Sequence, residues 1–276
     1  MAAPPGASDA TPSSDGPLQP RHDSSSGRKI LVEARGPVTV VTLNRPEVHN
    51  CIDAETADLL SDVIRSFADD DRARVMVITG AGNRAFSSGA DLTAVDELMQ
   101  RPGALRNAPL GFSNLEPGKP RIAAVEGYCL GGGIELACWC DFAIAGEDAS
   151  FGALNRASGV PWVDGGTQRM TRRIGVGNAL YLMETGERID ARRAREMGLV
   201  QEVVAPGRAL ERAVELADRV AAYPQKSLLA DRSAALATFG MSLEDGLKYE
   251  ASVGHPTASE PEFREGVRRF RHRKEK

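Results

Sequence analysis

Aromatic residues are scarce in this 276-residue chain, at 5% of the sequence. Base-stacking platforms for nucleic acid are therefore not expected. Positive charge is not in excess either, because the formal net charge is -4, which argues against binding nucleic acid through bulk charge. No apolar run reaches the roughly 20 residues that a membrane-spanning helix needs, and no G-x-G-x-x-G or Walker-type phosphate motif is present. We therefore expect a globular protein that needs no membrane and no nucleic acid.

Cysteines are also few, at Cys51, Cys129, Cys138 and Cys140. The first residues contain no apolar segment typical of a secretory signal, so we expect a cytoplasmic protein with free thiols. Cys138 and Cys140 form a C-x-C pair, but residues two apart on a helix do not face each other. No histidine lies near them in sequence. Small buried side chains are favoured over a metal site, and we predict no metal.

Three regions differ in composition. Residues 1–27 are rich in Pro, Ser, Gly, Ala and Asp without apolar periodicity, which predicts a disordered tail. Residues 28–206 alternate strand-like and helix-like patterns, which predicts an α/β core with crossover connections. Residues 207–276 are helical in pattern almost throughout.

Within the core, 29–34 and 38–43 are expected to form a hairpin around the turn at 35–37. A helix is expected over 53–69, with Asp53 as its N-cap. Further strands are expected at 75–79, 121–125 and 142–145, and further helices at 208–223, 226–239, 242–252 and 262–276. The stretch 99–120 has no clear period, and a loop of that length suggests function or mobility.

Two glycine turns stand out for their chemistry. Three glycines at 131–133 are followed by Glu135 and by an apolar run typical of a buried helix, and Gly89 lies in a turn that precedes Ala90. Each turn can present a bare backbone N–H. Two such groups that converge would form an oxyanion hole, with Glu135 one helical turn away.

Several ordered segments resemble the crotonase family, also called the enoyl-CoA hydratase/isomerase family. Each segment alone is a weak signal, but their shared order is specific. They are TLNRP at 42–46, TGAG at 79–82, AFSSGADL at 85–92, IAAV at 122–125, GGGIELA at 131–137, FG at 151–152, GGTQR at 165–169 and AREMGLV at 194–200.

The resemblance implies ββα turns wound into a superhelix, followed by a helical C-terminal region that packs on neighbouring subunits in trimers or hexamers. It also implies an acyl-CoA thioester substrate, with no cofactor beyond the coenzyme A of the substrate itself. By residue matching, the oxyanion-hole donors are the N–H groups of Ala90 and Gly132. The implied substrate contacts, for which turn and core packing is the alternative, are Val48, His49, Cys51, Ser88, Asp91, Leu92 and Trp162.

The carboxylates decide the reaction. Hydratases of this family use two glutamates, and the first matches Glu135. The position of the second is Asn155, which cannot act as a base at neutral pH and can only orient water or substrate. Asp164 is the replacement candidate, as in dienoyl-CoA isomerases and dihydroxynaphthoyl-CoA synthases. It could equally cap the next helix or pair with Arg156 or Arg169.

The expected function is hydration of 2-enoyl-CoA in fatty-acid or related acyl-CoA metabolism. An enoyl- or dienoyl-CoA isomerase that uses Asp164 is the first alternative. An acyl-CoA-binding protein with little hydratase activity is the second, because Asn155 replaces a catalytic group.

Overall fold

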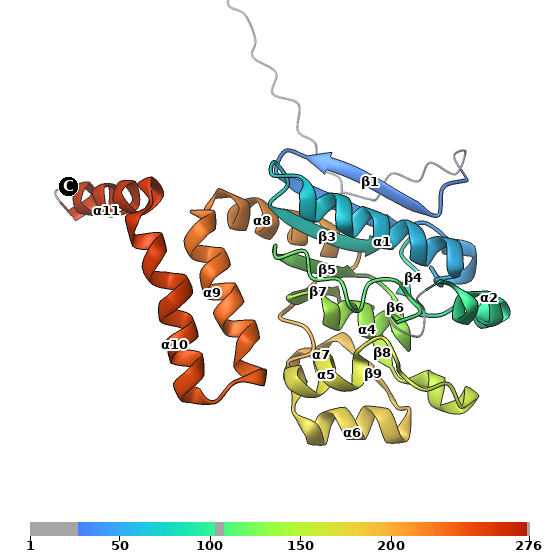
Figure 1. Cartoon of the computed structure of the whole chain (residues 1–276). Helices are drawn as coiled ribbons and strands as arrows, with labels where there is room; N and C mark the ends of the chain where they lie inside the picture. Colours follow the sequence, from blue (N-terminus) through green and yellow to red (C-terminus); the bar gives the residue numbers. More distant parts are fainter. Residues whose placement is uncertain (1–26, 103–107, 275–276) are drawn as a thin grey trace, which may run out of the picture.

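The computed structural model describes residues 27–102 and 108–274. Nearly all of the predicted disordered tail at 1–27 lies outside this range. Two β-sheets and the helices that pack on them form the main body, and the last helices extend away from it (Figure 1).

The larger sheet has six strands in the order β1-β2-β3-β5-β7-β10. Strand β1 runs antiparallel to β2, which confirms the predicted hairpin, and the other pairs are parallel. These strands are β1 (Ile30–Arg35), β2 (Val38–Leu43), β3 (Val75–Gly80), β5 (Arg121–Val125), β7 (Phe142–Gly146) and β10 (Glu202–Val204).

The smaller sheet has the order β4-β6-β8-β9, with β9 antiparallel to β8. Its strands have three residues each: β4 (Ala85–Ser87), β6 (Tyr128–Leu130), β8 (Ser150–Gly152) and β9 (Arg188–Asp190). Strands β3, β5 and β7 of the larger sheet each lead into β4, β6 or β8 of the smaller one. This repeated step between sheets is the predicted ββα winding.

Ten α-helices are described. They are α1 (Ala54–Asp69), α2 (Val95–Gln100), α4 (Gly132–Trp139), α5 (Gly166–Ile174), α6 (Val176–Thr185), α7 (Ala191–Met197), α8 (Ala209–Ala222), α9 (Gln225–Ala237), α10 (Leu243–Gly254) and α11 (Pro261–Lys274). Short 3₁₀ turns are η1 (Pro46–Val48), η2 (Leu92–Ala94), η3 (Leu154–Ser158), η4 (Thr238–Gly240) and η5 (His255–Ser259). None of the described helices is long and apolar enough to cross a membrane.

Both faces of the larger sheet are buried at its central strands β2, β3 and β5, and side chains alternate between the two faces along each strand. On β3, Val75 and Val77 pack against α8, whereas Met76 and Ile78 belong to the main core that includes α1 and α4. Helix α4 contributes seven buried residues to the region between the sheets. The helix that carries Glu135 is therefore held on all sides.

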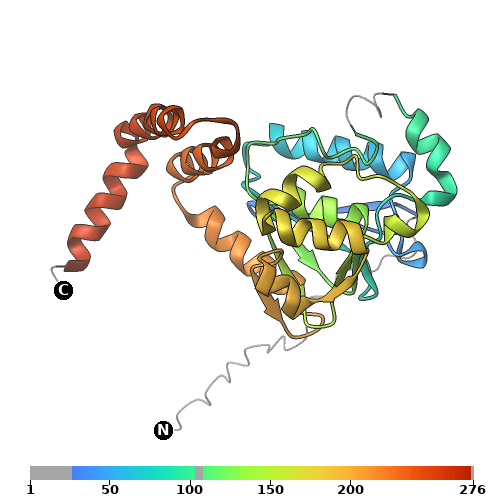
Figure 2. The same cartoon turned by 90° about the horizontal axis from the view of Figure 1, so that it is seen from below.

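Helices α9, α10 and α11 form a C-terminal arm that extends away from the sheets (Figures 1 and 2), and Arg232 of α9 joins it to the main body through an ion pair with Asp141 at 2.8 Å. Neither α9 nor α10 contains a buried residue. Apolar side chains on the arm are open to solvent, with Leu243 81% and Leu247 56% exposed. The predicted helical C-terminal region is confirmed, and within one chain most of its surface is uncovered.

Sequence patterns missed several elements. The four strands of the smaller sheet, strand β10 and helices α2, α5, α6 and α7 were not expected individually. Helix α2 also runs to Gln100, so the long irregular stretch expected from Met99 begins with helical residues. Part of that stretch, 103–107, lies outside the described residues.

Candidate active site

The two predicted glycine turns meet. Gly131 (φ +51°) is the N-cap of α4, and Gly89 (φ +85°) precedes Ala90 in the other turn. A Cβ atom added to Gly132 would lie 3.5 Å from the backbone nitrogen of Ala90 and 3.0 Å from Cα of Gly89. The backbones therefore approach so closely that only glycine leaves the space between them open.

The first turn is fixed by buried polar side chains. Ser87 Oγ donates to the carbonyl oxygen of Asn50 (2.9 Å) and accepts from the Gly89 N–H (3.1 Å). The Asn50 amide donates to the carbonyl oxygens of Ala81 (3.1 Å) and Ala85 (2.7 Å). These bonds hold the end of β4, and with it the N–H of Ala90, in one orientation.

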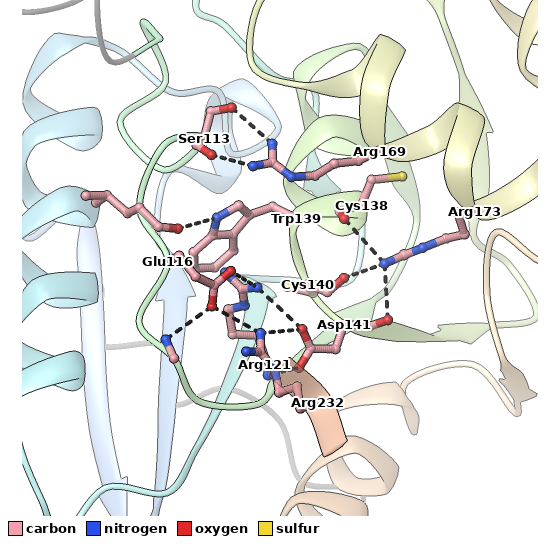
Figure 3. Close-up of polar contacts among 12 residues, drawn as sticks. Ser113, Glu116, Arg121, Cys138, Trp139, Cys140, Asp141, Arg169, Arg173 and Arg232 are labelled. Atoms are coloured by element: carbon pink, nitrogen blue, oxygen red, sulfur yellow. Dashed lines mark hydrogen bonds and ion pairs between the residues drawn. The ribbon is translucent and has the colours of Figure 1, made fainter. Parts of the chain in front are cut away.

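The second turn is fixed through helix α4. Gly132 is the first residue of α4, where N–H groups lack intrahelical acceptors and the helix dipole favours an anion. At the other end of α4, Arg173 donates to the backbone carbonyls of Cys138, Cys140 and Asp141 (Figure 3) and to that of Ala137. A charged side chain thus satisfies the C-terminal carbonyls and anchors the helix.

Glu135 is buried at 3% exposure on α4. Its Oε1 accepts hydrogen bonds from the backbone N–H groups of Asp164 and Gly166, each at 2.9 Å. Burial raises the pKa of Glu135 to about 8, although these two bonds oppose the shift. At neutral pH this carboxyl group mostly carries its proton.

Asp164 is also buried, at 1% exposure, and lies beside Glu135. Its Oδ1 accepts the backbone N–H of Leu110 at 3.0 Å. Burial raises the pKa of Asp164 to about 6, against the lowering effects of the Leu110 bond, Arg101 and Arg169. At neutral pH Asp164 is therefore mostly ionised, opposite in state to Glu135.

The alternative structural roles for Asp164 are not the ones observed. The N-cap of α5 is Gly165, without any side-chain cap bond. Arg169 donates to Ser113 (Figure 3). It also donates to the backbone oxygen of Asp164 (3.2 Å), rather than to the Asp164 carboxylate. Arg156 donates to the carbonyl oxygen of Val160. Neither alternative, a cap on α5 or an ion pair with Arg156 or Arg169, is present among the contacts of the described residues.

Asn155 lies at the rim of the same site, in η3. Its Nδ2 donates to the Val160 carbonyl oxygen at 2.7 Å, and its Oδ1 is buried without a hydrogen-bond partner among the described residues. A Cβ on Gly131 would lie 4.0 Å from Cβ of Asn155. The residue that departs from the two-glutamate pattern thus stands next to the oxyanion turn, with its amide held by its own loop.

A cavity of about 260 Å³ joins these groups. Ala90, Gly132, Glu135, Asn155 and Asp164 all line it. Most of its remaining wall is apolar: Leu92, Val95, Leu98, Met99, Pro109, Leu110, Leu130, Leu154, Val160, Pro161, Trp162 and Val163. An apolar acyl group would be compatible with this wall, and its thioester oxygen with the polar end.

Three of the seven residues expected to contact substrate line the cavity: Ser88, Leu92 and Trp162. The other four, Val48, His49, Cys51 and Asp91, lie outside the cavity wall. Asp91 caps η2 and pairs with Arg45 at 3.0 Å, and Cys51 Sγ lies 3.1 Å from Ser88 Oγ. His49 has φ +55°, and its ring centroid lies 5.9 Å from that of Tyr128.

Residues that support the carboxylates were not foreseen. Leu110 supplies the N–H to Asp164, and Ser113 Oγ donates to the Asp164 backbone oxygen at 2.7 Å. Both belong to the stretch that lacked periodicity, so only its unusual length pointed to a function.

The thiols are free, with Cys129, Cys138 and Cys140 buried. Within 27–102 and 108–274, no three His, Cys, Asp or Glu residues gather as metal ligands.

Comparison with known proteins agrees with this geometry. The model of the family described as "Enoyl-CoA hydratase/isomerase" matches residues 33–276. A probable enoyl-CoA hydratase of Rhizobium meliloti is 36% identical over 242 residues, which cover 87% of this chain and 94% of the relative. A carnitinyl-CoA dehydratase of Salmonella arizonae is 37% identical over 224 residues, covering 80% of this chain and 85% of the relative.

Solved structures show the same fold. An enoyl-CoA hydratase from Bacillus anthracis superposes with a TM-score of 0.83 at 31% identity, covering 89% of this chain and 97% of the other. One from Mycobacterium tuberculosis gives 0.83 at 32% identity, covering 89% and 96%. With the ordered motifs and the converging turns, these matches mean that the chain belongs to the enoyl-CoA hydratase/isomerase family.

Proposed function

We propose that this protein hydrates 2-enoyl-CoA thioesters, with Glu135 and Asp164 sharing the proton transfers. The observation that carries the proposal is the placement of two buried carboxyl groups beside the meeting point of the Ala90 and Gly132 turns. Relatives of similar length named as enoyl-CoA hydratases support the substrate class.

The oxyanion hole supplies the first part of the mechanism. As water adds to C3 of the enoyl group, negative charge develops on the thioester oxygen. The N–H groups of Ala90 and Gly132 stabilise that charge, and one such donor typically contributes about 3–4 kcal/mol to the transition state. The substrate contacts expected of Val48, His49, Cys51 and Asp91 would lie outside the acyl cavity, along the coenzyme A portion.

The two carboxyl groups supply the second part. Ionised Asp164 takes a proton from the attacking water as its oxygen bonds to C3. Protonated Glu135 then donates its proton to C2 of the enolate, which restores the thioester. The sum is one water added, and proton exchange between the two groups or with solvent resets the site. The difference between the two pKa values, about 6 and about 8, supports this division.

The proposal is tested with Asp164→Asn, which keeps an acceptor for the Leu110 N–H. We expect kcat on short and medium 2-enoyl-CoA esters to fall by at least about tenfold, since acid–base groups contribute roughly 10²–10⁴-fold. The exposed Asp62→Asn is the matched control. Unchanged turnover in Asp164→Asn would remove Asp164 from the reaction.

Isomerisation of an enoyl- or dienoyl-CoA is the second candidate. Asn155 in place of a second glutamate favours it, because two carboxyl groups can also move a proton between carbons. Identification of products from 2-enoyl, 3-enoyl and dienoyl esters separates the two reactions. Binding of acyl-CoA without turnover of any of them would support the binding-protein alternative instead.

The C-terminal arm supports a proposal about assembly. Its exposed apolar residues would be covered if α9, α10 and α11 packed on neighbouring subunits, and we propose a homotrimer or a hexamer of two trimers. Action in the cytoplasm, in fatty-acid or related acyl-CoA metabolism and without a separate cofactor, completes the proposal.

A further inference from the structure

Arg101 is a buried charge just outside the cavity. It follows α2, and its side chain is only 8% exposed. Its Nε donates to Asp58 Oδ1 at 2.6 Å, and its Nη2 lies 3.4 Å from Ser61 Oγ. Both partners lie on one face of α1, three residues apart, so α1 holds the guanidinium of Arg101 from one side.

The other side of Arg101 contacts a single peptide group. Nη1 donates to the carbonyl oxygen of Pro109 at 3.0 Å. The N–H of that same peptide unit belongs to Leu110 and donates to Asp164 Oδ1 at 3.0 Å. A cation on the oxygen of an amide polarises its N–H, so the two hydrogen bonds strengthen each other.

The same peptide group also orders the site sterically. The Leu110 side chain lines the cavity, and a Cβ on Gly132 would meet its Cδ1 at 2.6 Å. Displacement of the Pro109–Leu110 peptide would therefore move both the donor to Asp164 and a wall of the oxyanion turn.

Few charged groups face Asp164. Glu135 approaches it from α4, and Arg169 of α5 contacts its backbone oxygen. Arg101 acts from the α1 side and, like Arg169, lowers the pKa of the Asp164 carboxyl against the raising effect of burial. Arg169 is engaged with Ser113, which leaves Arg101 as the cation connected to the Asp164 carboxylate through a hydrogen-bonded peptide.

We infer that Arg101 is a positioning residue for the proposed reaction: through the Pro109–Leu110 peptide it orients the Asp164 carboxylate and favours its ionised form. Asp58 in turn holds Arg101. The inference rests on the proposed role of Asp164 and adds a residue that lines no part of the cavity wall.

The test is the pH dependence of kcat/KM in Arg101→Met, which keeps chain length and removes charge. The acidic limb of this profile is the rise of kcat/KM with pH as Asp164 ionises. We expect its midpoint to move to higher pH by about half a pH unit or more, with kcat affected more than KM. Arg101→Lys should restore part of the shift because it keeps the charge. Arg65→Gln, at an exposed arginine of α1, should leave the limb in place.

The outcomes separate this inference from the proposed function. If Asp164→Asn loses activity but the Arg101→Met limb stays at the wild-type pH, Arg101 is only structural and the inference is overturned. If Asp164→Asn keeps full activity, the proposed function fails first. Should Arg101→Met not fold, Asp58→Asn and Arg101→Lys carry the test. A shift of the acidic limb to higher pH in either variant supports the inference. An acidic limb at the wild-type pH in both variants overturns it.

Discussion

The Oε1 atom of Glu135 lies 2.9 Å from the backbone nitrogen of Asp164 and accepts its N–H. One carboxyl group therefore fixes the backbone of the residue that carries the other. Substitutions at Glu135 must keep an acceptor at this position if their effect on chemistry is to be separated from their effect on Asp164, and glutamine does so.

The rate should depend on pH as a bell. Asp164 must be ionised to accept a proton, so kcat/KM should rise with pH through about 6. Glu135 must be protonated to donate, so kcat/KM should fall again through about 8. Measurement of the hydration rate across this pH range checks both limbs.

In Glu135→Gln the hydration rate should drop by about 10²-fold or more, and full activity of this variant would contradict the assignment of Glu135.

Stability should also depend on the Glu135 proton. Between pH 4.5, its ordinary pKa, and about 8, the folded protein holds a proton that the unfolded chain has lost. The free energy of unfolding should therefore fall as pH rises through that window, by about 3–5 kcal/mol from this group alone. In Glu135→Gln, the free energy of unfolding measured with urea should depend less steeply on pH. Exposed Glu47→Gln is the control and should keep the wild-type slope.

Gly132→Ala should damage the oxyanion hole. Its Cβ would lie 3.5 Å from the Ala90 nitrogen, in space proposed for the thioester oxygen, and 2.6 Å from Leu110 Cδ1. We expect a loss of about 10²–10³-fold in kcat. The double variant Gly132→Ala/Leu110→Ala relieves only the Leu110 contact and should remain impaired. Recovery in the double variant would show that crowding of Leu110 was the cause. Gly177→Ala, in open space on α6, is the neutral control.

Asn155→Ala should cost less activity than Asp164→Asn. The Asn155 amide holds the Val160 carbonyl and cannot exchange a proton at neutral pH. Its loss should loosen η3 and lower kcat by less than about tenfold, against the larger acid–base contribution of Asp164. Steady-state kinetics of the two variants side by side make the comparison. A greater loss in Asn155→Ala would point to Asn155 as the group that orients water.

Charges on the arm should dissociate the proposed oligomer. Leu243→Glu/Leu247→Glu places two carboxylates on an exposed apolar face of α10. Sedimentation or light scattering should then report a smaller particle than for the wild type, because burial of unpaired charge at an interface is costly. Glu250→Gln on the same helix is the control. A wild-type protein that is itself monomeric would overturn the proposed assembly.

Elements with strong local signals could be predicted from sequence. Helix α1 combines apolar periodicity with an N-cap, and Asp53 does accept the Thr56 N–H. The oxyanion turns and Glu135 were predicted because glycines and a carboxylate occur at fixed spacing, and the structure brings these turns together. Their roles in catalysis remain proposals.

Other features depend on contacts that no local pattern records. The three-residue strands β4 and β6 are defined by their pairing with each other across the chain. Whether Asp164 capped α5 or faced the cavity was open in sequence, since its neighbours fit either arrangement. Arg101 reaches Asp58, which is 43 residues away, through packing of a loop on α1. Such contacts arise from tertiary structure alone.

The chain contains two tryptophans, and they occupy separate environments. Trp162 lines the cavity, whereas Trp139 is buried, with the Arg121 guanidinium 4.1 Å from its ring centroid. Its indole N–H donates to the carbonyl oxygen of Leu115 (Figure 3). The protein thus contains two tryptophan fluorophores in different surroundings. We expect the emission of Trp162 to change when the cavity is occupied and the emission of Trp139 to change when the core unfolds, without any added label.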